Sequence, residues 1–157
     1  MPARTTAPKA KTPKKTRYLF KITVIGPDDF LLKEVLHAFS EKVVEVDGIS
    51  ISAAGHKTGN SDVEALIMSP AYSALDVMLS LTFKGASGVI VALREPDELT
   101  ELAYRNKAKS NAGDVPTRAL SVGPGLTDEK RKEIVRLLNE MLEEIVTARE
   151  GAQPSKH

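Results

Sequence analysis

Histidine is the residue type in this sequence best suited to acid–base or metal chemistry, and three are present: His37, His56 and His157. An imidazole titrates near neutral pH and ligates metals, but no HExxH or HxH spacing occurs, so no metal site is predicted. His56 lies in the polar, glycine-containing stretch Gly55–Ser61, which is expected to be a loop. Anion binding beside its glycines is one interpretation, and an ordinary surface connector is the other.

Paired carboxylates are the second group that could do acid–base chemistry. The pairs Asp97-Glu98 and Asp128-Glu129 stand at expected helix starts, where capping and the helix dipole account for them. The pair Glu143-Glu144 fits the polar face of an amphipathic helix. The sequence therefore predicts no catalytic residues.

The glycine turn after the first expected strand raises the question of phosphate binding. A P-loop needs Gly-x-x-x-x-Gly-Lys-Ser/Thr, whose backbone N–H groups and lysine surround the phosphates. Counting from Gly26, Lys33 falls within one residue of the required lysine, but Leu32 replaces the second glycine and Glu34 the hydroxyl residue. Asp28 would bring negative charge into the cradle. Gly26 and Lys33 are the only candidate cofactor-binding residues, and no cofactor is predicted.

Hydrophobic patterning indicates the elements that position these residues. Asp47-Gly48 favours a two-residue turn inside a hairpin over residues 43–52. Strands are expected at 19–25, 63–68, 89–93 and 115–122, with helices at 29–42, 72–83, 96–109 and 127–148. This alternation predicts a three-layer α/β fold whose sheet is mostly parallel, with one antiparallel edge hairpin. Ligands in such folds bind at the carboxyl ends of the strands.

Charge is distributed unevenly along the 157 residues. Residues 1–17 hold six of the 22 basic residues, none of the 21 acidic ones, and several prolines. Such a segment cannot bury enough apolar surface to fold, so residues 1–17 are expected to be a disordered basic tail. Residues 18–148 form the expected domain, and residues 149–157 are expected to fray. The tail is either a solubilising leader or a polyanion-binding segment, through Arg4, Lys9, Lys11, Lys14, Lys15 and Arg17.

Composition excludes several classes of protein. The chain has no cysteine, which rules out disulfides, a thiolate nucleophile and cysteine-ligated metals. No apolar stretch approaches the roughly 18 residues of a membrane-spanning helix. At 41% hydrophobic and 27% charged residues the composition is typical of a globular domain. A cytoplasmic location is expected.

Several stretches together resemble the Ras-like small GTPases, especially the prokaryotic ones of cell polarity and gliding motility. They are residues 21–27, the hairpin at 43–51, residues 66–91, and residues 119–122 with the final helix. The resemblance implies a P-loop NTPase topology, in which the short stretch between Leu93 and Val122 lacks one strand–helix unit. It also implies a protein partner, either a roadblock-type regulator or an intact small GTPase. The partner would dock near the switch-II helix, at Pro70, Ala71, Tyr72, Ala74, Leu75 and Met78.

The family's chemical motifs are missing. The switch-II motif Asp-x-x-Gly aligns with residues 68–71, where Met68 replaces the aspartate and Ala71 the glycine. The guanine-reading Asn-Lys-x-Asp motif has no counterpart. The sequence is interpreted as a non-catalytic, GTPase-like interaction or scaffold module. Two alternatives stay open: a GTP-binding protein with a divergent site, in which Lys33 or His56 supports turnover, and a nucleic-acid- or ribosome-associated protein that binds through its tail.

Overall fold

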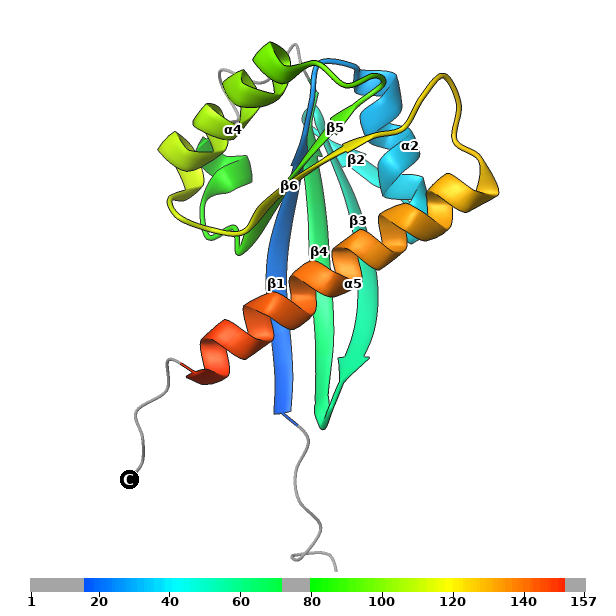
Figure 1. Ribbon diagram of the computed structural model, residues 1–157. Coiled ribbons are helices and arrows are strands. Elements are labelled where there is room, and N and C mark those ends of the chain that lie inside the picture. Colours follow the sequence, from blue (N-terminus) through cyan, green and yellow to red (C-terminus); the bar gives the residue numbers. More distant parts are fainter. Residues whose placement is uncertain (1–15, 72–79, 152–157) are drawn as a thin grey trace, which may run out of the picture.

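The molecule is built on a six-stranded mixed sheet with strand order β2-β3-β4-β1-β5-β6 (Figure 1). The computed structural model describes residues 16–71 and 80–151. The strands are β1 (Thr16–Ile25), β2 (Val44–Val46), β3 (Ile49–Thr58), β4 (Ser61–Pro70), β5 (Gly88–Leu93) and β6 (Thr117–Ser121). The long helices are α2 (Asp29–Phe39), α4 (Glu98–Ala112) and α5 (Asp128–Gly151), and residues 80–83 form a short helical turn.

The sheet is parallel at its centre and has helices on both faces. β1 runs parallel to β4 on one side and to β5 on the other, and β6 continues the parallel arrangement. Helices α2 and α5 pack on one face, and α4 packs on the other. The predicted three-layer α/β architecture is confirmed at this level.

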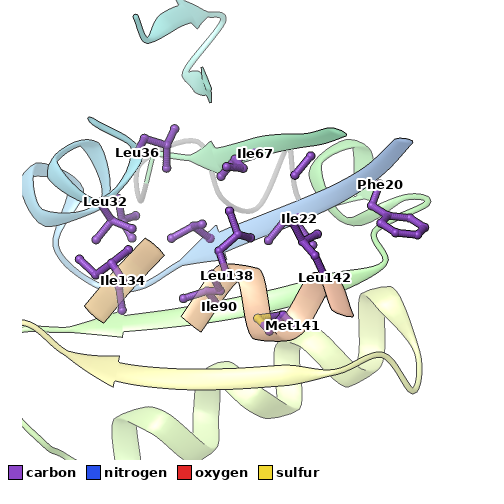
Figure 2. Packing of buried hydrophobic residues seen from close by; sticks show 14 of the residues in the cluster. Phe20, Ile22, Leu32, Leu36, Ile67, Ile90, Ile134, Leu138, Met141 and Leu142 are labelled. Carbon is purple, nitrogen blue, oxygen red and sulfur yellow. The ribbon is translucent and has the colours of Figure 1, made fainter. Parts of the chain in front are cut away.

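Helix α5 provides most of the cover on its face of the sheet. Figure 2 shows its apolar stripe meeting side chains of β1, β4 and β5. Leu138 and Met141 of α5 are fully buried together with Ile22 of β1 and Ile90 of β5. Removing each such side chain from water stabilises the fold by roughly 1.5–3 kcal/mol. The core is mainly aliphatic, as the scarcity of aromatic residues predicts, but the rings of Phe20 and Phe83 are also fully buried.

The hairpin around Asp47-Gly48 forms as predicted. β2 and β3 pair antiparallel, with Val46 opposite Ile49. Asp47 and Gly48 have φ angles of 51° and 81°, which is the conformation that a type I′ turn requires.

The prediction that residues Gly55–Ser61 form a loop is wrong. β3 continues to Thr58, turns through Gly59 and Asn60, and pairs antiparallel with β4 along its whole length. Small and polar residues hid the strand pattern, because the positions of β3 that face α2 and α5 are Ser52, Ala54 and His56 instead of large apolar residues. The sheet therefore has two consecutive antiparallel pairings rather than a single edge hairpin.

Both ends of the folded domain lie beyond the expected bounds, and the other described elements, apart from β3, differ from expectation by up to three residues at their ends. β1 begins at Thr16, inside the segment expected to be disordered. Helix α5 continues to Gly151, so residues 149–151 are helical rather than frayed. Of the helix expected at 72–83, residues 72–79 lie outside the described residues.

Candidate functional site

The N-terminus of α2 lies at the carboxyl end of β1, and its free N–H groups bind a carboxylate of the chain itself. Asp28 is the N-cap residue, and its Oδ1 accepts hydrogen bonds from the backbone N–H groups of Phe30 at 3.0 Å and Leu31 at 3.1 Å. A helix N-terminus presents free N–H groups and a positive dipole end to an anion. At this helix the anion is the Asp28 side chain.

Arg94 fixes that carboxylate from the turn that follows β5. Its Nε lies 3.0 Å from Asp28 Oδ2, and its Nη2 lies 3.0 Å from Glu34 Oε1 on α2. Its Nη1 donates to the carbonyl oxygens of Gly123 at 3.3 Å and Pro124 at 3.4 Å. One guanidinium thus joins the carboxyl ends of β1, β5 and β6.

The charges in the crevice around Asp28, at the carboxyl ends of β1 and β5, oppose a bound phosphate. The pKa of Asp28 lies below its ordinary value, first because the Leu31 N–H binds the charged form and also because of Arg94, while partial burial acts in the opposite direction. A neighbouring cavity of about 420 Å³ is lined by Asp28, Glu95 and Asp97 as well as by Arg94. A phosphate would meet three carboxylates there, and the guanidinium is already paired.

The two candidate cofactor-binding residues have other roles in the structure. A Cβ atom on buried Gly26 would lie 2.3 Å from the carbonyl oxygen of Ala92, so the close approach of β1 to β5 requires glycine. Lys33 Nζ pairs with Glu45 Oε1 of β2 at 3.2 Å. Local packing and pairing account for both residues.

Replacing Asp28 by alanine is expected to lower the free energy of unfolding by about 1–2 kcal/mol at pH 7, because the N-cap is lost. Asparagine at this position should cost less, since it caps almost as well. Because the folded pKa of Asp28 is depressed, its stabilisation is complete above the unfolded aspartate pKa of about 3.9 and is lost as the pH falls through the folded value. Urea denaturation of both variants at pH 7 and pH 3 checks this; an alanine variant as stable as the parent at pH 7 would contradict it.

On the sheet face opposite α2 and α5, helix α4 packs over β5, and the described residues cover β1 and β4 only in part. The part of this face over β1, β3 and β4 is called the open sheet face. Lys21 Nζ donates to the carbonyl oxygens of Leu81 and Lys84, at 2.7 and 2.8 Å, so the turn at 80–83 lies on this face. Burial lowers the pKa of Lys21. Leu19 and Leu66 share this face by strand alternation and register, and they are 75% and 38% exposed. Sequence reasoning missed this surface, because a strand run alone does not show which face remains uncovered.

No family model matches the sequence, and no curated protein matches it.

The predicted partner-binding residues are described only in part. Pro70 is buried as the last residue of β4, and the backbone N–H of Ala71 donates to the Gly48 carbonyl at 2.8 Å. Tyr72, Ala74, Leu75 and Met78 lie outside the described residues.

Of the predicted polyanion-binding residues, only Arg17 is described. It is exposed on β1, with Asp62 as its register partner on β4. The others, at positions 4, 9, 11, 14 and 15, lie outside the described residues. Within residues 16–71 and 80–151, no helix combines the length and apolar character that crossing a bilayer requires.

Within the described part of the chain, the histidines belong to no cluster of residues that could hold a metal ion. His37 is exposed on α2. His56 Nε2 lies 2.8 Å from Glu143 Oε2, which ties β3 to α5. Nothing in the sequence marks this pair, because its members stand 87 positions apart.

Proposed function

We propose that this chain is a protein-interaction module on a Ras-like frame, in which the chain's own side chains replace the nucleotide. The observation that carries the proposal is the Asp28 carboxylate, which caps α2 and is held by Arg94. The position where backbone N–H groups would meet a phosphate is already taken by a fixed negative charge.

The arrangement of the elements supports the Ras-like frame. β1 lies between two parallel neighbours, β4 and β5, and a helix follows it directly. Only one helix–strand unit, α4 with β6, stands between β5 and α5. This agrees with the expected loss of one strand–helix unit, while β2 adds an edge strand beside β3.

The residues present do not fit a nucleotide and its magnesium ion. The donors at Phe30 and Leu31 are used by Asp28. Lys33, the nearest candidate for a phosphate-binding lysine, pairs with Glu45. Met68, which replaces the switch-II aspartate of the resemblance, offers no oxygen ligand to a hard cation. We therefore derive no hydrolytic step.

Titration calorimetry of the full chain with GTP, GDP and ATP, each with magnesium, tests the proposal. We expect no saturable heat. The melting temperature should also stay unchanged at millimolar nucleotide, because a ligand at 100 times its Kd would stabilise the fold by about 2.7 kcal/mol. An intact small GTPase in the same buffer is the positive control. Micromolar binding of any of the three nucleotides would overturn the proposal and favour the divergent GTP-binding alternative.

Exposed apolar side chains support the proposal that this chain binds another protein. Leu19 and Leu66 lie on the open sheet face, and Leu81 is exposed on the turn that Lys21 holds. Apolar side chains that remain exposed together often mark interaction surfaces. The partner class that the resemblance suggests is a roadblock-type regulator or an intact small GTPase. Co-purification from the native cell tests that choice.

A further inference from the structure

The outer edge of β3 is only half covered. β2 is short and pairs with Ile49–Ile51 alone. The rest of β3, from Ser52 to Thr58, pairs with β4 on its inner side and has no strand on its outer side among the described residues. Figure 1 shows this half of the β3–β4 hairpin extending below α5.

Strand geometry identifies the backbone groups that this edge leaves unpaired. Thr58 and Ser61 close a two-residue turn, so they form a hydrogen-bonded pair, and such pairs alternate along an antiparallel ladder. The N–H and C=O groups of Thr58, His56 and Ala54 therefore face β4. Those of Ala53, Gly55 and Lys57 face outward, and all three residues are exposed.

The side chains beside this edge are complementary in charge. Lys57 and Glu64 lie on the open sheet face, and Gly55, the register partner of Glu64, places no side chain between Glu64 and the edge. All three residues line one hollow of about 610 Å³. A lysine arriving from outside the edge could therefore cross above Gly55 and reach Glu64.

We propose that two copies of this chain pair antiparallel through these edges, with Gly55 opposite Gly55 of the second copy. This register places Lys57 opposite Ala53 of the second copy, so that outward-facing groups meet outward-facing groups. It forms about six backbone hydrogen bonds, two for each pair. In this register Lys57 of each copy extends across Gly55 of the other copy toward that copy's Glu64. The two-fold symmetry forms this contact twice.

The second copy is the occupant that the observations favour. A two-fold axis at Gly55 places no like charges directly opposite one another, since Lys57 faces alanine and His56 faces Ala54 of the second copy. The two lysine–glutamate contacts use one chain's residues on both sides, which a self-complementary interface requires. The pairing goes beyond the proposed function and does not depend on what fills the crevice at Asp28.

Cysteine cross-linking tests the register directly, because the chain has no cysteine of its own. Opposed residues of a hydrogen-bonded pair have Cα atoms about 5.5 Å apart, within the range that a disulfide spans. The Gly55→Cys variant of the full chain should oxidise to a covalent dimer at least about tenfold faster than Asn60→Cys at the hairpin tip. Equal rates for the two variants would overturn this register.

Charge exchange tests the interface in the uncross-linked protein. By sedimentation equilibrium we expect a dimer, and Lys57→Glu and Glu64→Lys should each weaken it by about tenfold, since attraction becomes repulsion at both contacts. An equimolar mixture of the two variants should recover parental association, because opposite charges then meet again at both contacts of the mixed dimer. The exposed α5 variant Lys132→Glu is the control and should associate like the parent.

Circular dichroism of each variant separates loss of pairing from loss of folding. A parental chain that stays monomeric at about 100 µM would overturn the proposal and leave the edge to a strand of another protein. A mixture no stronger than the single variants would also overturn it, since the charges would then act within one chain.

Discussion

Replacing Gly26 by alanine is expected to lower the free energy of unfolding by about 3 kcal/mol, because the new Cβ would overpack a site that cannot yield. The atom it would meet, 2.3 Å away, is the backbone carbonyl oxygen of Ala92 in the neighbouring strand β5. A flexible side chain could move aside, but a strand held on both sides cannot. Urea denaturation without any nucleotide measures the effect.

Gly125→Ala is the matched control. A Cβ there meets no atom within 4 Å, and Gly125 does not have a positive φ, so its effect should stay within about 0.5 kcal/mol. The comparison also bears on the purpose of Gly26. A glycine kept for phosphate binding would tolerate alanine in the nucleotide-free protein, so a Gly26→Ala variant as stable as the control would contradict the packing role.

Replacing Phe20 by alanine is expected to destabilise the fold by about 4 kcal/mol, the usual cost of emptying a phenylalanine site in a core. Phe20 is 1% exposed on β1. Its ring stacks on Tyr18 at 5.4 Å between centroids, and the Arg149 guanidinium of α5 lies 5.2 Å from its centre. The side chain therefore helps to join the end of α5 to the first half of β1.

Phe30 offers a control of the same residue type. It lies on α2 and is 74% exposed, so Phe30→Ala should change stability by no more than about 0.5 kcal/mol. Chemical denaturation of both variants side by side gives the difference. Equal losses would show that the Phe20 ring contributes no more to the core than an exposed ring does.

Local signals predicted much of the fold. The apolar run before Gly26 and the run at residues 89–93 became β1 and β5, both central strands. Asp47-Gly48 predicted the position of the first hairpin, which β2 and β3 form. The acidic pairs also marked helix starts: Asp97 of the first pair caps α4 and accepts from the Thr100 N–H at 3.1 Å, while Thr127, next to the second pair, accepts through Oγ1 from the Lys130 N–H at 3.1 Å. In each case short-range chemistry and the tertiary structure agree.

Features that depend on distant residues were not predictable in the same way. The continuation of β3 rests on its pairing with β4, and neither Gly55 nor His56 favours a strand by itself. The sequence offered either Asp28 or Asp29 as the cap of the first helix, and it gave no sign of Arg94, which stands 66 positions from Asp28 and meets it only where the strand ends come together. The open sheet face follows from which helices cover which strands, and periodicity does not contain that information.

The contact between Asp28 and Arg94 has a consequence for regulation under the proposed function. Signalling GTPases work as timers, because hydrolysis removes the group that holds their active shape. A chain that supplies its own fixed anion has nothing to hydrolyse and no second state for a nucleotide to select. Under the proposed function its complexes would then form and dissolve with the concentrations of the partners, with no hydrolytic step to end them.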